Sequence, residues 1–208
     1  MDWLTSLRQA GIAIGSSADL LPPDQWAALQ AQATRVRGDR FARLQADLES
    51  RDRRQAKGFL RQWLGRHPLY DGHSIWADIA RTLAPLATAY LGAQAILRFY
   101  NLWEVRPTTQ PPSRSQLWHR DMEDTRIVKA FLYLSDVIPG AGPLIYAPGT
   151  QQGGAAAHEQ PDTFIEQGSG WARATDAAIA AIVPATAWRC AYGSIGTLAL
   201  ADTAGWHK

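Results

Sequence analysis

The sequence contains very little cysteine and no long apolar run. Cys190 is the one cysteine in 208 residues, which excludes an internal disulfide and a zinc site built from several cysteines. No stretch reaches the roughly 18 apolar residues that a membrane-spanning helix needs. The N-terminus carries Asp2 and no apolar signal segment. These absences predict a cytoplasmic protein without a membrane partner.

The chain also lacks a strong excess of charge of either sign. Its formal net charge is +2, from 21 basic and 19 acidic residues, so the charge gives no indication of a nucleic-acid partner. Hydrophobic residues make up 46% of the chain, as in folded globular proteins. At this length we expect a single domain, residues 1–208, with a sizeable core.

The first part of the chain, residues 1–93, is predicted to be a helical region. Residues 25–64 are rich in Ala, Leu, Gln and Arg, and Gly38-Asp39 is expected to interrupt the helix there. Ser74 is a suitable N-cap for a further helix from Ile75 to Tyr90.

The second part, residues 94–208, is predicted to be mainly β. Its candidate strands are rich in branched and aromatic residues and are bounded by Gly and Pro. They cover residues 95–105, 127–134, 144–147, 187–192 and 197–201, and an Ala-rich helix is expected near 174–182. Short strands without regular alternation with helices argue against a doubly wound parallel sheet. They favour an antiparallel barrel or jelly roll, cupin-like, with flanking N-terminal helices.

A His-x-Asp motif lies before the strand 127–134. In an extended segment His119 and Asp121 point to the same side, so both can bind one ion. Two histidines and one carboxylate on one face form the facial triad of non-haem Fe(II) oxygenases. His207, which follows the strand 197–201, is the best candidate for the third ligand. A lone His-x-Asp is weak evidence, and a loop histidine beside a solvated aspartate is the alternative.

The stretch QLWHRDMEDTRIVKAFLYLSDVIPGAGPLIYAPGT, residues 116–150, resembles the core of the phytanoyl-CoA dioxygenase-like family. Proteins of this family are Fe(II)- and 2-oxoglutarate-dependent oxygenases. The resemblance implies a double-stranded β-helix in which His119, Asp121 and His207 bind iron. It further implies that Fe(II), 2-oxoglutarate and O2 are used to hydroxylate an unactivated C–H bond of a small-molecule substrate. Asp121 favours hydroxylation over halogenation, since related halogenases have a small residue at that position.

The sequence departs from the family pattern at its end. An arginine that binds the far carboxylate of 2-oxoglutarate usually follows the distal histidine, whereas this chain ends at Lys208. We therefore expect a C-terminally incomplete oxygenase without its last strand. Lys129, on the strand face of Phe131 and Tyr133, is a candidate substitute for the arginine, or else a lysine at a barrel edge. Asn101 is a second candidate ligand of 2-oxoglutarate, or a polar residue on a pleat.

Two other functions remain open from the sequence. One is a cupin-like metalloenzyme that does not use 2-oxoglutarate, and the other is an inactive binding module with the same fold. The identity of the substrate and the oligomeric state are not indicated by any motif.

Overall fold

The computed structural model describes residues 2–47, 60–67, 74–106, 108–165 and 172–208. The chain forms two compact units. The first comprises Met1–Ser16, Leu86–Gln94 and Gln110–Lys208, and the second comprises Ser17–Pro85 and Ala95–Thr109. Within the described ranges, no helix is long and apolar enough to cross a bilayer.

The first unit begins with helix α1 (Trp3–Ala10), which leads directly into strand β1 (Ile12–Ser16). The Asp2 carboxylate caps α1 by accepting a hydrogen bond of 3.0 Å from a backbone N–H in the first turn. Gly11 ends the helix with a φ of 76°, a left-handed conformation that favours glycine. A Cβ at Gly11 would also overlap the Tyr146 hydroxyl, so glycine is needed at this turn.

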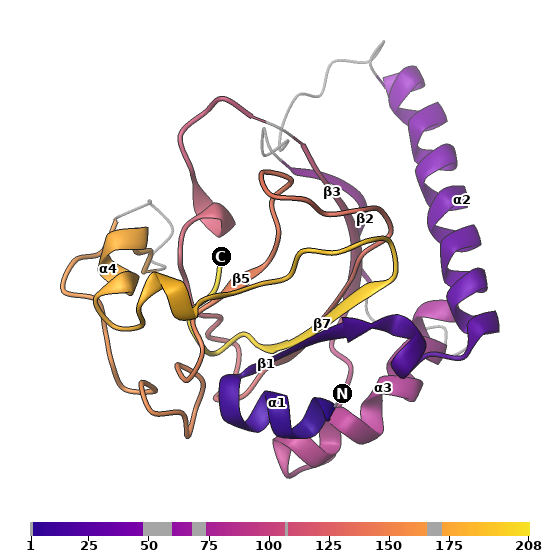
Figure 1. The fold of residues 1–208 in the computed structure, drawn as a ribbon. Coiled ribbons are helices and arrows are strands. Elements are labelled where there is room, and N and C mark those ends of the chain that lie inside the picture. Colours follow the sequence, from indigo (N-terminus) through magenta and orange to yellow (C-terminus); the bar gives the residue numbers. More distant parts are fainter. Residues whose placement is uncertain (1, 48–59, 68–73, 107, 166–171) are drawn as a thin grey trace. The chain divides into compact units, whose positions relative to one another are not determined.

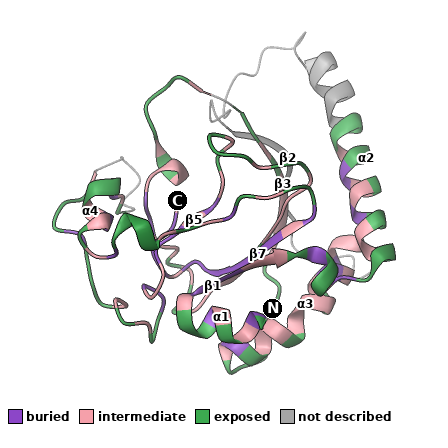
Figure 2. Ribbon diagram, in the orientation of Figure 1, coloured by how far each residue is buried: buried purple, intermediate pink, exposed green. Residues whose placement is uncertain are grey.

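The main sheet of the first unit is antiparallel and has the order β1-β7-β4. It contains β4 (Val128–Leu132) and β7 (Thr197–Asp202), and β7 runs beside β1 (Figure 1). Every residue of β7 after the first is buried (Figure 2). Ala201 pairs with Ile12 on one side and with Lys129 on the other. Opposed residues of an antiparallel pair point to the same side, so Lys129 shares its face with the core residue Ile12.

Two further strands and a short helix complete the first unit. β5 (Ile145–Tyr146) pairs antiparallel with β6 (Arg189–Cys190), and α4 (Asp176–Ala180) precedes β6. Short 3-10 turns cover Arg114–Gln116 and Ala185–Ala187. Among the described residues of this unit, buried side chains form two clusters. One comprises Ile12, Leu144, Tyr146, Ala191, Ala199 and Ala201, and the other comprises Trp118, Ala147, Ala174, Ile179, Val183 and Trp206.

The second unit combines helices with a two-stranded antiparallel sheet. The sheet pairs β2 (Leu60–His67) with β3 (Tyr100–Val105). A 3-10 turn, Ser17–Asp19, precedes the long helix α2 (Pro23–Asp47). Most of α3 (Ile75–Leu91) also belongs to this unit, and its last residues belong to the first.

The prediction of helices in the N-terminal part is confirmed for α3 and partly wrong for residues 25–64. The helix expected after Ser74 is confirmed, and the Ser74 hydroxyl accepts a 3.3 Å hydrogen bond from a backbone N–H of its first turn. The helix expected over 25–64 is present as α2 up to Asp47, but without the expected interruption, because α2 continues through Gly38. Residues 60–67 form the strand β2 instead of a helix, and residues 48–59 lie outside the described part of the chain. A glycine costs a helix about 1 kcal/mol, which a helix of 25 residues tolerates. Pairing with β3 prevails over the helical propensity of the residues in β2.

The strands predicted in the second part all occur, four of them shorter than expected. β1 was not expected, because it lies in the region predicted as helical, and yet it is an edge of the main sheet. The helix expected near 174–182 is α4, Asp176–Ala180. The architecture is therefore one of small antiparallel sheets with helices.

Candidate metal centre

The segment of residues 118–121 is held in place by backbone hydrogen bonds to residues 203–207. His119 exchanges two with His207, at 2.8 and 3.0 Å. The Asp121 N–H donates to the Thr203 carbonyl at 2.8 Å. Because alternate residues of an extended segment point to the same side, the side chains of His119 and Asp121 face the same space.

The side chains of Trp118 and Arg120 do not point into the space that His119 and Asp121 face. Arg120 donates a hydrogen bond to the Ala204 carbonyl at 3.2 Å and lies over the Trp206 ring, 5.1 Å from its centroid. The Trp118 side chain is fully buried. These contacts anchor the segment, so its polar face keeps one orientation.

His207 reaches the site through the turn that follows β7. Asp202, the last residue of β7, is fully buried. Its carboxylate accepts a hydrogen bond from the Tyr90 hydroxyl at 2.7 Å and two from backbone N–H groups, of Ile127 at 3.2 Å and Ala204 at 3.1 Å. This buried carboxylate therefore sets the path of the turn that leads to His207.

The second half of the turn is equally constrained. The Trp206 N–H donates to the Thr150 hydroxyl at 2.8 Å, and the Trp206 carbonyl accepts from the Ala147 N–H at 3.0 Å. A Cβ at Gly205 would overlap the Tyr146 hydroxyl. The close approach of Tyr146 thus requires glycine two residues before His207.

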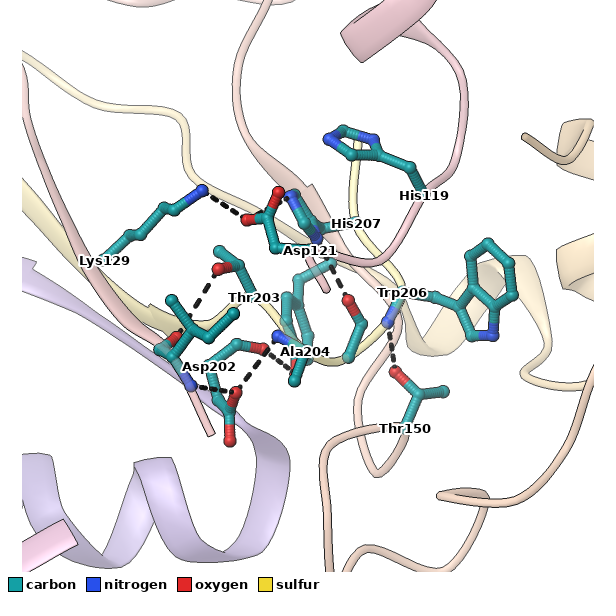
Figure 3. Close-up of polar contacts among 12 residues, drawn as sticks. His119, Asp121, Lys129, Thr150, Asp202, Thr203, Ala204, Trp206 and His207 are labelled. Carbon is teal, nitrogen blue, oxygen red and sulfur yellow. Dashed lines mark hydrogen bonds and ion pairs between the residues drawn. The ribbon is translucent and has the colours of Figure 1, made fainter. Parts of the chain in front are cut away.

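The three predicted ligands lie together (Figure 3). His119, Asp121 and His207 each present one ligand atom, and these atoms lie within 4.8 Å of one another. The Nε2 atom of His207 is 3.7 Å from Oδ2 of Asp121, and the two imidazole centroids are 4.2 Å apart. Both histidines are buried, with 8% and 5% of their surface exposed. Residues far apart in the sequence are thereby brought to one site, as the motif predicts.

Backbone carbonyls select the tautomer of both histidines. Nδ1 of His119 lies 2.9 Å from the Leu117 carbonyl, and Nδ1 of His207 lies 3.0 Å from the Gly205 carbonyl. A carbonyl oxygen only accepts, so Nδ1 carries the hydrogen and donates it. Nε2 of each neutral ring then keeps its lone pair for a metal ion, and the carbonyl fixes the ring orientation.

Burial and charge favour the protonation states that metal ligands need. Burial lowers the pKa of His119, and the neighbouring His207 lowers it further. Burial also lowers the pKa of His207, against the opposite effect of Asp121. Burial by itself would raise the pKa of Asp121, but His207 and Lys129 outweigh it, and the pKa lies below its ordinary value. The site therefore offers two neutral imidazoles and one carboxylate.

Lys129 extends from β4 to this site. Its ammonium contacts Oδ2 of Asp121 (Figure 3). The sequence predicts that Phe131 and Tyr133 lie on the same strand face as Lys129. Both pack against the core cluster around Tyr146. Asn101 lies in β3 of the second unit, and its role as a cosubstrate ligand stays a prediction.

Three residues at the site were not predicted from the sequence. The side chain of Thr203 lies beside Asp121 and contributes to its lowered pKa. Thr150 holds the backbone before His207, and Arg173 acts by its charge on both histidines. Thr150 ends the stretch that resembles the oxygenase family, but its contact with the site, like those of Thr203 and Arg173, arises from pairing between distant segments.

The donor set fits a divalent transition metal with open coordination positions. Two imidazole nitrogens and one carboxylate oxygen are the ligands of facial-triad iron sites. Donors bound at right angles around such an ion lie roughly 3 Å apart. The 3.7 Å between His207 and Asp121 is near that value, and the widest pair, at no more than 4.8 Å, has to close by less than ~2 Å.

Solved structures of SnoN and AviO1 have a similar fold. The epimerase SnoN, in complex with Fe3+, alpha ketoglutarate and nogalamycin RO, aligns over 99% of this chain and 74% of its own, with 18% identity and a TM-score of 0.59. The chain shares its fold with SnoN. A second SnoN structure is that of the non-heme alpha ketoglutarate dependent epimerase from nogalamycin biosynthesis. It aligns over 99% of this chain and 72% of its own, with 15% identity and a TM-score of 0.53. AviO1 from Streptomyces viridochromogenes Tue57 aligns over 99% of this chain and 84% of its own, with 20% identity and a TM-score of 0.56.

No family model and no curated protein sequence matches this chain. The similarity to SnoN and AviO1, at 20% identity or less, concerns the fold. Membership of the phytanoyl-CoA dioxygenase-like family therefore stays a prediction.

Proposed function

We propose that this protein is an Fe(II)- and 2-oxoglutarate-dependent dioxygenase that acts on an unactivated C–H bond of a small molecule. The observation that carries the proposal is the cluster of His119, Asp121 and His207, with both Nε2 atoms available to a metal. The proposal is supported by SnoN, which has the same fold and binds iron and alpha ketoglutarate. In this proposal the sheets of the first unit belong to a double-stranded β-helix that holds the triad.

Each residue of the site has a defined task in this proposal. His119 and His207 supply nitrogen ligands, and Asp121 supplies an oxygen ligand with a negative charge. Iron bound there, with 2-oxoglutarate and O2, supplies the oxidising power for breaking a C–H bond. Lys129, predicted from the sequence to replace the arginine at the far carboxylate, lies beside Asp121 and is here proposed to assist 2-oxoglutarate at its metal-binding end instead.

Hydroxylation is the proposed outcome. The substrate, O2 and 2-oxoglutarate are converted to the hydroxylated product, succinate and CO2. Epimerisation is a second candidate, favoured by the activity of SnoN. The two are separated by mass spectrometry of the product: hydroxylation adds one oxygen atom derived from O2, whereas epimerisation leaves the mass unchanged and inverts a carbon centre.

The decisive experiment is an anaerobic titration with Fe(II) followed by 2-oxoglutarate. We expect stoichiometric Fe(II) binding and then the visible charge-transfer absorption of a 2-oxo acid chelated to Fe(II). His119→Ala should lose both signals. His158→Ala is the matched control, since His158 is exposed and outside the triad.

The same titration tests the alternatives. Tight Fe(II) binding without the absorption band on addition of 2-oxoglutarate would support a cupin-like metalloenzyme of another kind. Absence of metal binding in the wild-type protein would support a binding module and contradict the proposed function.

A further inference from the structure

We propose that Arg173 binds the distal carboxylate of 2-oxoglutarate. This inference rests on the proposed function and extends it by assigning a residue to the end of the cosubstrate that points away from the metal. Arg173 lies outside every motif identified in the sequence. Three properties carry the assignment: its position in the backbone pairing, its charge and its partners.

The backbone pairing places Arg173 next to the triad. Ala174 exchanges two hydrogen bonds with Trp118, at 2.9 and 3.2 Å, and the two residues form an antiparallel bridge. In antiparallel register the residue before Ala174 lies across from the residue after Trp118, which sets Arg173 across from His119. This is a position without direct hydrogen bonds, where opposed side chains lie closest and on the same face. His207 is paired to the other edge of His119.

The charge interactions of Arg173 agree with the position that the backbone pairing gives it. The charge of Arg173 lowers the pKa of both His119 and His207, after the larger effect of burial. Burial lowers the pKa of Arg173 itself, and the Asp121 carboxylate acts in the opposite direction. A guanidinium remains charged in proteins. Arg173 is therefore a fixed positive charge beside the proposed metal centre.

Arg173 has donors to spare. Its guanidinium donates to the adjacent Ala172 carbonyl at 3.2 Å, and no carboxylate of the described residues forms an ion pair with it. The neighbouring cations are already engaged: Lys129 contacts Asp121, and Arg120 donates to the Ala204 carbonyl. With a divalent metal, the positive charges of the site would outnumber the single negative charge of Asp121. A dianionic ligand offsets that excess.

Lys129 and Arg173 carry different cationic groups, which suit different ends of 2-oxoglutarate. An ammonium is a compact charge, and that of Lys129 lies against a proposed metal ligand. A guanidinium presents a planar fork that matches a carboxylate with two parallel hydrogen bonds. Arg173 is thus suited to the free carboxylate of a dicarboxylic acid, and Lys129 to the end shared by all 2-oxo acids.

A pair of ligands tests this division. 2-Oxoglutarate and 2-oxopentanoate have the same chain length, but 2-oxopentanoate has a methyl group in place of the distal carboxylate. Affinities are measured anaerobically by calorimetry on protein loaded with Fe(II) and, separately, with Mn(II). We expect wild-type protein to bind 2-oxoglutarate more tightly by on the order of 10- to 100-fold, the contribution of a charged hydrogen-bonded pair.

Arg173→Gln should remove most of this preference by weakening 2-oxoglutarate alone. Arg173→Lys, which keeps the charge without the fork, should restore part of it. Lys129→Met should weaken both ligands to a similar degree. Arg189→Gln is the matched control, since Arg189 is exposed on β6, and it should change neither affinity. An unchanged circular dichroism spectrum and an unchanged urea unfolding midpoint show that each variant keeps its fold.

Three outcomes would overturn the assignment. A wild-type protein that binds both ligands equally has no distal carboxylate site. A preference that survives in Arg173→Gln but disappears in Lys129→Met assigns the carboxylate to Lys129. Failure of wild-type protein to bind either ligand, with metal bound, rejects both this inference and the use of 2-oxoglutarate.

Discussion

His119 and His207 are directly joined through their backbones, by reciprocal N–H to carbonyl hydrogen bonds of 2.8 and 3.0 Å. The side chains of such a pair emerge on the same side, and here the ring centroids are 4.2 Å apart. Two ligand candidates from distant parts of the sequence are therefore held by main-chain pairing. Any change that shifts the turn before His207 should act on metal affinity as well as on stability.

Gly205→Ala tests this coupling. The new Cβ would overlap the Tyr146 hydroxyl and lie 3.0 Å from the Gln151 backbone nitrogen. Overpacking of this kind costs about 1–3 kcal/mol, and the displaced turn should weaken Mn(II) binding in parallel. Urea unfolding and metal titration measure the two effects.

Tyr146→Phe in the Gly205→Ala background is the control. It removes the overlapping hydroxyl, but also the hydrogen bond from that hydroxyl to the Asp202 carbonyl, so the reference for the double variant is Tyr146→Phe alone. Gly205→Ala should cost less stability and less metal affinity in that background than in the wild type, because the closest overlap is gone. A Gly205→Ala protein with wild-type stability and metal affinity would contradict the constraint at this turn.

Asp202 should contribute more to stability than its partner Tyr90. Tyr90→Phe removes one hydrogen bond to the buried carboxylate and should cost about 1 kcal/mol. Asp202→Ala leaves the Tyr90 hydroxyl and two backbone N–H groups without their acceptor, which should cost about 3 kcal/mol or more. Chemical denaturation ranks the two variants, with Asp162→Ala as an exposed control. Equal losses for Tyr90→Phe and Asp202→Ala would show that the backbone contacts of Asp202 add little.

Local sequence signals predicted a good part of this structure. The Ser74 cap and the apolar pattern after it define α3, because a helix depends on neighbours in sequence. The His-x-Asp spacing identified two site residues for a similar reason, since alternation in an extended segment is a local property.

Features that depend on non-local pairing were not predictable in the same way. The residues of β1 follow a helix without a loop, and their partner β7 lies at the far end of the chain. Residues 60–67 contain Leu, Arg and Gln, which favour helices in isolation, yet they pair with β3. Arg173 lies beside His119 because Ala174 pairs with Trp118, and no spacing in the sequence reveals that register.

The metal-free protein should lose stability as the pH falls below about 6.5, the ordinary pKa of histidine. Burial lowers the pKa of His119 and of His207 in the folded state. Between the unfolded and folded pKa values the unfolded chain binds more protons, so the free energy of unfolding decreases as pH decreases. Asp121, whose pKa is also lowered, adds a loss only at lower pH, below its unfolded value.

Urea unfolding at pH 7.5 and 5.5 measures this dependence. His119→Gln should reduce the difference between the two conditions, whereas His158→Gln, at an exposed position, should not. An identical pH dependence in wild type and His119→Gln would show that His119 does not carry the effect.

Lys129→Met should strengthen metal binding while it weakens 2-oxoglutarate binding. In the metal-free protein the ammonium of Lys129 occupies Oδ2 of Asp121, so a cation arriving at this carboxylate has to displace it. Such a partly exposed pair contributes about 0.2–1 kcal/mol, and its removal should tighten Mn(II) by about 1.4- to 5-fold. Lys129→Arg, which keeps the competing charge, should bind Mn(II) as wild type does. Weaker Mn(II) binding in Lys129→Met would mean that the lysine supports the ligand geometry of Asp121 instead of competing for it, because the loss of orientation would then outweigh the removal of a positive charge.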